Sequence, residues 1–235
     1  MIVSADNERL KLVRKLHDRR WREKLGLFFV EGEDAVDAAA AEPVDLLRAG
    51  EDVEPRLLAA VATAPHPPRV IAVYRRDDLP GWSERPATLA LWRLSDPGNV
   101  GTLIRTADAF GAAVVLSPGC ADPTSPKALR ASAGSIWRVP LGTWDDVGGT
   151  RVALEAHAGE PLATVDLRGR VAFLLGAERE GLPAEAARDV EAWIPIAGAE
   201  SLNVAASGAI ALYEWRRQTQ TESSPPRHGE RSNHP

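Results

Sequence analysis

The chain has 235 residues, 44% hydrophobic and 26% charged, which suits one large and one small folded unit and excludes a globally disordered chain. The single cysteine, Cys120, excludes an internal disulfide and a cysteine-based zinc site, and the five scattered histidines suggest no metal. No stretch of about 18 apolar residues predicts a membrane span, and no apolar signal segment follows Met1, so we expect a cytoplasmic protein.

Basic residues are concentrated at the N-terminus, although the formal net charge of the chain is −5. Residues 1–24 contain eight Lys and Arg and four Asp and Glu, which makes this segment a basic arm on an acidic body. Such an arm can contact the phosphates of a nucleic acid. A solvated charged helix is the alternative interpretation of the same pattern.

The first 76 residues predict a small α/β unit. Leu10, Val13 and Leu16 lie on one side of an amphipathic helix over 6–18, with Ser4 or Asp6 as its cap. Apolar runs and Ala-rich stretches then alternate as strand, helix, strand, helix and strand. We expect these elements at 27–32, 33–42, 44–50, 54–64 and 69–76.

A larger α/β unit follows a polar linker with Pro, Gly and Ser at 77–86. We expect strands at 88–94, 112–116, 152–157, 170–176 and 192–196, and helices at 99–110, within 125–134 and at 202–218. Strands separated by helices predict a parallel sheet with helices on both faces. The tail 219–235 has almost no apolar residue, so we expect it to be disordered.

The segment 96–111, DPGNVGTLIRTADAFG, joins an apolar strand to an amphipathic helix. The turn residues Pro97 and Gly98 place Asn99 at the helix N-cap, where its side chain can accept from backbone N–H groups. Helix N-termini at the carboxyl ends of parallel strands are where such sheets bind ligands. Arg105 follows nearly two turns later. A capping Asn and a surface Arg are the structural alternative.

The segment 173–183, FLLGAEREGLP, is a buried strand that ends in Gly176, with Gly181 five residues later. A glycine at this point permits close approach of the backbone to a flat ligand. The phosphate-binding patterns G-x-G-x-x-G and G-x-x-x-x-G-K-[ST] are absent from the sequence. A nucleotide-like ligand would therefore be held by backbone amides.

The segment 194–215 places Ser201 and Asn203 just before a helix that is rich in small residues. Ser-Leu-Asn is typical of a helix N-cap, and this is the structural interpretation of the segment. Small residues at helical spacing also allow a neighbouring element to pack closely.

Together, these three segments resemble the three motifs of the SpoU/TrmH family of RNA 2′-O-ribose methyltransferases, in the SPOUT superfamily of class IV methyltransferases. The matching positions are Asn99, Gly101, Arg105, Ala107, Phe110 and Gly111, then Gly176, Glu178, Gly181 and Leu182, then Pro195, Ser201, Leu202 and Asn203. Residues 127–141 resemble a stretch common in ribosomal-RNA members, at Arg130, Ser132 and Gly134.

Residues 7–32 resemble the start of the ribosomal-protein-like domain that precedes the catalytic domain in many members. Between Gly50 and Pro65 the chain has one short predicted helix where relatives carry more, so the small domain is abridged. The resemblance implies an α/β fold, with a SPOUT-type parallel sheet and a C-terminal trefoil knot. The implied parts are a substrate-binding domain at 1–76, a linker at 77–86, a catalytic domain at 87–218 and a tail at 219–235.

The resemblance also implies methyl transfer from S-adenosyl-L-methionine to a ribose 2′-hydroxyl of RNA, by a homodimer that needs no metal. The implied catalytic residues are Asn99, Arg105, Glu178, Ser201 and Asn203. The implied cofactor contacts are Gly176, Ala177, Ile196, Ser201 and Leu202. The expected RNA contacts are Arg14, Arg19, Arg20, Arg22 and Arg130.

Arginine keeps its proton at neutral pH, so we expect Arg105 to orient the hydroxyl and stabilise the developing alkoxide, while a phosphate oxygen or water accepts the proton. We expect ribosomal RNA as the substrate. A tRNA methyltransferase of the same family is one alternative, which the abridged small domain permits. A non-catalytic RNA-binding protein that kept the fold is another, which the acidic composition permits.

Overall fold

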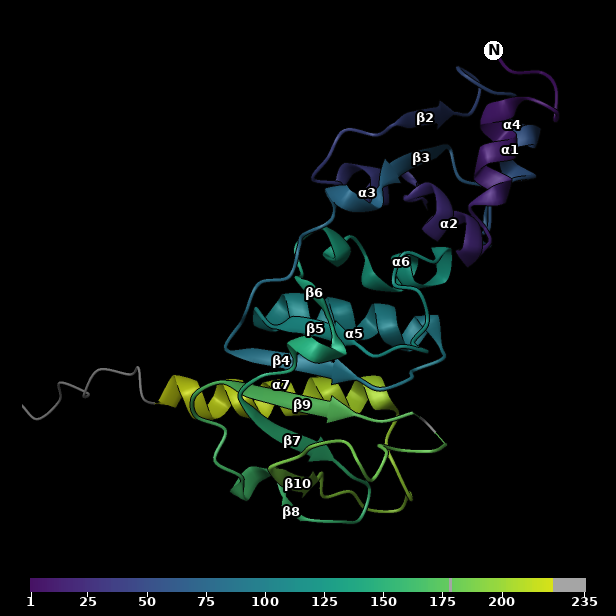
Figure 1. Ribbon diagram of the computed structural model, residues 1–235. Coiled ribbons are helices and arrows are strands. Elements are labelled where there is room, and N and C mark those ends of the chain that lie inside the picture. Colours follow the sequence, from purple (N-terminus) through teal and green to yellow (C-terminus); the bar gives the residue numbers. More distant parts are fainter. Residues whose placement is uncertain (178, 222–235) are drawn as a thin grey trace, which may run out of the picture.

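The computed structural model describes residues 1–177 and 179–221. It contains two β-sheets, one above the other in Figure 1. The smaller sheet is antiparallel in the order β1-β3-β2, and the larger has seven strands in the order β6-β5-β4-β9-β7-β10-β8. Every neighbouring pair in the larger sheet is parallel, which confirms the expected α/β class with a parallel sheet.

The strands of the small sheet are β1 (Leu27–Glu31), β2 (Asp45–Arg48) and β3 (Val70–Arg75). Those of the large sheet are β4 (Ala87–Leu91), β5 (Ala113–Leu116), β6 (Leu141–Thr143), β7 (Thr150–Leu154), β8 (Glu160–Pro161), β9 (Val171–Leu175) and β10 (Val190–Trp193). The α-helices are α1 (Glu8–Lys15), α2 (Arg19–Leu25), α3 (Glu33–Asp37), α4 (Pro55–Ala59), α5 (Pro97–Phe110), α6 (Pro126–Ser132) and α7 (Val204–Thr221). Short 3-10 helices are η1 (Arg76–Asp78), η2 (Ser135–Trp137), η3 (Trp144–Asp146) and η4 (Leu162–Thr164).

Two helix starts differ from the expected ones. Asn7, not Ser4 or Asp6, caps α1 by accepting from the backbone N–H of Arg9. Asp96 caps α5 and accepts from the N–H of Gly98 at 2.7 Å, so Asn99 lies inside the first turn. Pro97 explains this shift, because proline is favoured at the first helical position and the cap is then the residue before it. At the other end of the chain, α7 continues to Thr221, and the rest of the predicted tail lies outside the described residues.

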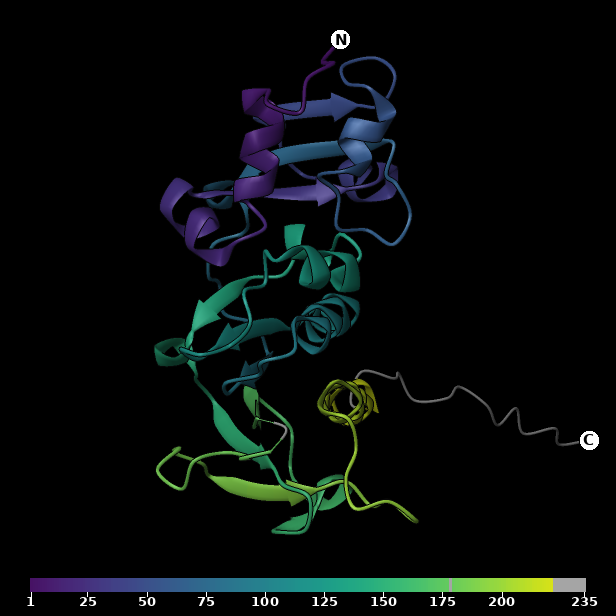
Figure 2. The same ribbon diagram turned by 90° about the vertical axis from the view of Figure 1, so that its right-hand side faces the viewer.

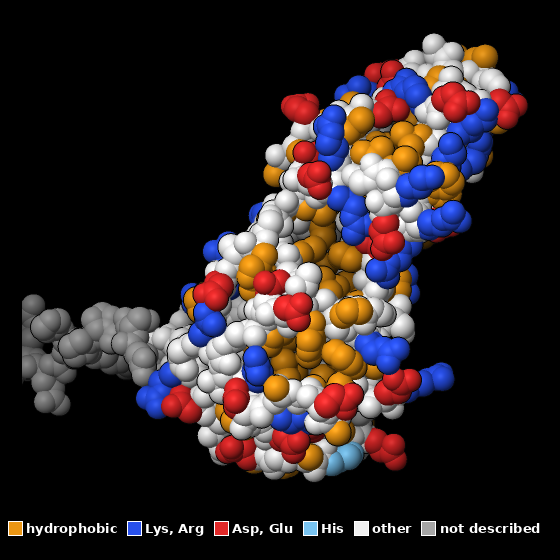
Figure 3. Space-filling view, in the orientation of Figure 1, with side chains coloured by type: hydrophobic (Ala, Val, Ile, Leu, Met, Phe, Trp, Pro, Cys, Tyr) orange, Lys and Arg blue, Asp and Glu red, His pale blue; other side chains and the backbone are white. Residues whose placement is uncertain are grey.

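The prediction that helices cover both faces of the large sheet was wrong for the described residues. Figure 2 shows α5, α6 and α7 on one side of the sheet. The connection from β6 to β7 is only long enough for η3 and a turn. The face of the sheet opposite the helices is therefore covered mainly by partly buried side chains such as Trp82 and Trp144. Figure 3 views the molecule from this side, where hydrophobic side chains remain visible across the sheet.

The two sheets are joined by a shared core. Alternate residues of β1 and β3 face opposite ways: Phe29 packs with apolar residues of α1, whereas Phe28 and Tyr74 belong to the core of the larger sheet. The ring centroids of Phe28 and Tyr74 lie 5.7 and 4.9 Å from that of Trp137 in η2. The small sheet is therefore packed tightly onto the larger part.

A buried ion-pair cluster strengthens the same junction. Asp122, in the loop after β5, accepts from Arg22 of α2 at 2.8 Å and from Arg76 of η1 at 3.3 Å. The Arg22 and Asp122 side chains are each 3% exposed. Burial by itself would raise the pKa of Asp122, but the charge of Arg76 and hydrogen bonds from Thr124 and Arg22 outweigh burial and lower it.

None of the described helices is long and apolar enough to span a membrane.

Candidate active site

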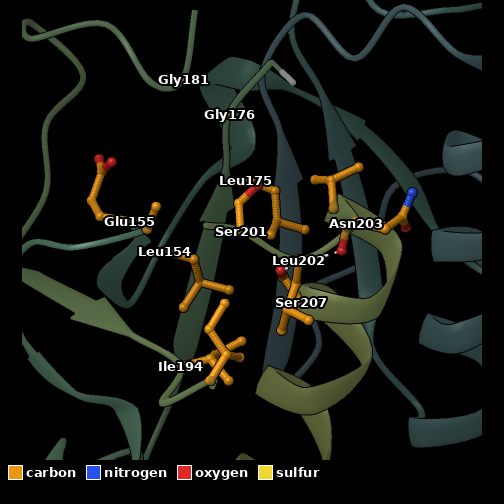
Figure 4. Close-up of a pocket in the computed structure, with 13 residues that line it drawn as sticks. Leu154, Glu155, Leu175, Gly176, Gly181, Ile194, Ser201, Leu202, Asn203 and Ser207 are labelled. Carbon is orange, nitrogen blue, oxygen red and sulfur yellow. Dashed lines mark hydrogen bonds between the residues drawn. The ribbon is translucent and has the colours of Figure 1, made fainter. Parts of the chain in front are cut away.

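A pocket of about 390 Å³ opens at the carboxyl ends of β7, β9 and β10, beside the start of α7 (Figure 4). This edge of a parallel sheet is where α/β proteins bind ligands. The lining residues are Leu154, Glu155, Ala156, Leu175, Gly176, Gly181, Ile194, Ile196, Ser201, Leu202, Asn203, Val204 and Ser207. The pocket thus brings together the second and third sequence motifs, including four of the five expected cofactor contacts.

Ala177 is the expected cofactor contact that does not line the pocket. Instead it exchanges two backbone hydrogen bonds with Gly181, which close the loop after β9. Gly176 is required by this loop, because a Cβ at that position would lie 2.3 Å from the carbonyl carbon of Gly181. The backbone at Gly176 therefore lies close to the backbone at Gly181, and it also lines the pocket.

Asn203 connects the third motif to the first. Its Oδ1 accepts from the backbone N–H groups of Ala205 at 2.9 Å and Ala206 at 3.3 Å, so it caps α7. Its Nδ2 donates to Oδ1 of Asn99 at 3.2 Å. One side chain therefore both caps α7 and contacts the first motif, whereas the sequence left a cap and a site residue as alternatives.

Glu155 is a pocket residue that the sequence reasoning missed, and Arg188 is its ion-pair partner. Glu155 follows β7 and lines the pocket on the side away from Asn203 (Figure 4). Its Oε1 accepts from Arg188 at 2.9 Å, while Oε2 has no hydrogen-bond partner among residues 1–177 and 179–221. The only signal in the sequence was an acidic residue inside the apolar strand predicted at 152–157.

Arg105 lies away from this pocket. It is exposed on α5, and its side chain makes no hydrogen bond or ion pair within the described ranges. Arg105 lies six positions after Asn99 on the helix. This spacing places the two residues about 9 Å apart along the helix axis and about 120° apart around it. Ser201 lines the pocket, and the predicted catalytic residue Glu178 lies outside the described residues.

The expected RNA contacts are placed differently from one another. Arg22 is buried in the junction, so it offers no surface to RNA, and its assignment as a contact was wrong. Arg130 bridges to Glu31 at 2.8 Å, and Arg19 pairs with Glu23 at 2.7 Å, but both keep exposed surface. Arg14 is partly buried and Arg20 is exposed. These four remain predicted contacts, and the basic side chains over α1 and α2 gather along one edge of the molecule in Figure 3.

The described residues contain no group of three or more His, Cys, Asp or Glu side chains that could hold a metal ion.

Residues 86–213 match the model of the SpoU rRNA Methylase family, which is more than half of the chain. An uncharacterized tRNA/rRNA methyltransferase of Synechocystis is 32% identical over 95% of this chain and 96% of its own length. The 23S rRNA (guanosine(2553)-2′-O)-methyltransferase RlmP of Bacillus subtilis is 32% identical over 92% of this chain and 98% of its own length. The crystal structure of an AdoMet-bound rRNA methyltransferase from Sinorhizobium meliloti superposes with a TM-score of 0.81 at 30% identity, covering 92% of this chain and 97% of that one.

Proposed function

Since the chain belongs to the SpoU rRNA Methylase family, we propose that it is an S-adenosylmethionine-dependent enzyme that methylates a ribose 2′-hydroxyl, and that its substrate is ribosomal RNA. The observation that carries the proposal is the pocket formed by the second and third motifs, joined to the first motif through Asn203 and Asn99.

The pocket fits the cofactor in size and in chemistry. Its volume falls within the range of about 300–1,000 Å³ typical of small-molecule sites. Leu154, Ile194 and Leu202 give apolar walls that suit an adenine ring. Glu155 has a carboxylate oxygen left to accept from ribose hydroxyls, since Arg188 engages the other oxygen. We infer that these side chains, with the backbone near Gly176 and Ile196, hold the cofactor.

The reaction needs a positioned and activated hydroxyl. When bound, S-adenosylmethionine supplies a methyl group on a positively charged sulfur. The Asn99–Asn203 pair orients the target hydroxyl beside the pocket, and Ser201 lines the same wall. Arg105 stabilises the negative charge that develops on the hydroxyl oxygen, and a phosphate oxygen or water accepts the proton. Glu178 supports this network.

A homodimer would explain why Arg105 lies away from the pocket of its own chain. On α7, Ile210 and Tyr213 are 38% and 61% exposed. These two hydrophobic side chains lie on the side of the helix that faces away from the sheet. Arg105 is exposed on the neighbouring helix, α5. We infer that a second copy covers these two helices and that Arg105 acts at the partner's pocket.

Ribosomal RNA is favoured because RlmP and the Sinorhizobium enzyme, both named for rRNA, match over 92% of this chain, which includes most of the small sheet. The test is methylation with tritiated cofactor, using ribosomal RNA and tRNA purified from cells that lack the protein. We expect label at a ribose 2′-oxygen of ribosomal RNA alone. Label in tRNA alone would overturn the choice of substrate. Label in neither, with no heat on titration with S-adenosylhomocysteine, would overturn the enzymatic function.

A further inference from the structure

The backbone bends unusually where β4 ends. Arg93 has a φ of +50°, a left-handed conformation that it shares, among non-glycine residues of the described ranges, only with Ala133. Neighbouring groups fix it there: the N–H of Trp92 donates to the carbonyl of Leu175 at 2.8 Å, and the N–H of Arg93 donates to Oγ of Ser117 at 2.9 Å. Side chains with a Cβ are disfavoured in this conformation, and glycine or asparagine would suit it better.

The contacts of the Arg93 side chain do not account for an arginine at this position. The side chain is 57% exposed, and its ion-pair partner among the described residues is Glu180 at 3.9 Å, itself 77% exposed. Exposed pairs at such distances contribute little stability. The stem lies against Gly119, where a Cβ would come within 3.3 Å of Nε. The guanidinium makes no hydrogen bond within the part of the chain that the structure describes.

The position of Arg93 points to the site instead. It lies at the carboxyl edge of β4, three residues before the helix cap Asp96 and six before Asn99. Its contact Glu180 belongs to the loop between Gly176 and Gly181, which forms part of the pocket wall. Arg93 therefore lies between the two loops that carry the first and second motifs. Disfavoured conformations held by their surroundings cluster at functional sites.

We propose that Arg93 binds a phosphate of the substrate RNA beside the ribose that is methylated. The inference rests on the proposed function, which brings an RNA strand to this edge of the sheet. A target ribose held at the Asn99–Asn203 pair has a phosphate on each side. An exposed guanidinium with no hydrogen bonds of its own has the planar donor geometry that phosphate oxygens fit. Arg93 does not line the pocket, so cofactor binding does not depend on it.

The test compares Arg93→Gly and Arg93→Gln with the matched control Arg168→Gln. The control removes an exposed arginine just before β9, at the edge of the sheet opposite to the pocket. The readouts are affinity for purified ribosomal RNA across a salt series, affinity for S-adenosylhomocysteine, and melting temperature. Both Arg93 variants should bind RNA about tenfold more weakly, with the slope of log K against log salt reduced by about 1. Cofactor affinity should stay unchanged, and Arg168→Gln should behave like the wild type.

Arg93→Gly should also melt no lower than the wild type, because glycine tolerates the left-handed conformation, so weaker RNA binding cannot then be a folding defect. Unchanged RNA affinity and salt slope in both Arg93 variants would overturn the proposal. RNA binding that depends on Arg93 in a protein that never transfers methyl would uphold the phosphate contact and count against the proposed function alone.

Discussion

At the scale of single residues, Asn203 makes one contact for the fold and another with a residue of the proposed site. One end of its amide caps α7, and the other end donates to Asn99. We expect Asn203→Asp to keep the cap, and even to favour it through the helix dipole, while losing the donor to Asn99. Turnover should then fall roughly a hundredfold at unchanged or higher melting temperature. Asn203→Ala should lose both, at about 1 kcal/mol of stability.

Thermal unfolding and single-turnover methylation separate these two effects of Asn203. If Asn203→Asp turned over at the wild-type rate, the contact with Asn99 would have no part in catalysis. If Asn203→Ala were as stable as the wild type, the cap would contribute nothing to folding.

Arg105 gives a second residue-scale prediction. Its exposed side chain should act only on charge that develops during methyl transfer, so Arg105→Ala should lower turnover by a factor of roughly 10² to 10³. Arg105→Lys should recover little, because lysine lacks the planar fork of donors. Affinity for S-adenosylhomocysteine, measured by calorimetry, should stay within a factor of about two. Near-native turnover of Arg105→Ala would show that the residue is not catalytic.

The sequence could predict residues of the site that belong to local motifs, and it failed where contacts are distant. Ser201, Leu202 and Asn203 were predicted through the family resemblance of one short motif, whereas the local pattern by itself indicated only a helix cap, and all three line the pocket. The pair of Glu155 and Arg188 could not be found, because the two residues are 33 positions apart and meet only when β7 and β10 are neighbours. Their pairing depends on strand order, which single-sequence periodicity does not record.

At the scale of elements, α7 divides its residues between two tasks. Its small residues were expected to let a neighbouring element pack closely, and Gly208 faces inward, where a Cβ would lie 2.4 Å from Leu103 of α5. Ile210 and Tyr213 are exposed on the same helix, and this is the side on which we propose that the second copy binds. The small residues thus allow α5 and α7 of one chain to pack closely.

We expect Tyr213→Glu to convert the dimer into a monomer at micromolar concentration, because a charge would be buried in the apolar contact. Val44→Glu, which alters a comparably exposed hydrophobic residue on the small sheet, is the control and should leave the dimer intact. Light scattering measures the mass of both variants. A wild-type protein that is already monomeric under these conditions would contradict the proposed interface.

Most predicted elements are present, with bounds that differ by a few residues, because long apolar runs mark buried strands well. The missed strands β6 and β8 have only three and two residues, too few to show a period. The helix α2 was also missed, because its one buried side chain, Arg22, is charged and leaves no apolar stripe. Helices on both faces were expected from a general pattern that needs long connections, and the connection from β6 to β7 is short. The trefoil knot and the domain bounds stay predictions, since strand order by itself does not describe how the chain is threaded.

At the scale of the whole molecule, the buried Asp122 links α2, η1 and the large sheet. Asp122→Asn should lower the free energy of unfolding by about 3 kcal/mol, because Arg22 would keep a buried charge without its partner. The folded-state pKa of Asp122 is lowered, so its contribution is present above the unfolded-state pKa near 4 and is lost as pH falls through the folded value. Urea unfolding should show a difference between wild type and variant that is full at pH 7 and shrinks below about pH 4. A constant difference across this range would exclude the ionised carboxylate as its source.

The shared core of the two sheets has a consequence for how such chains diverge. Phe28, Tyr74 and Trp137 fill one space from three separate elements, so a change in the volume of one ring must be met by a change in another. Among relatives that keep both sheets, these three positions should vary together. The small sheet of one relative should also fit poorly when exchanged for that of another, unless the residue at position 137 is exchanged with it.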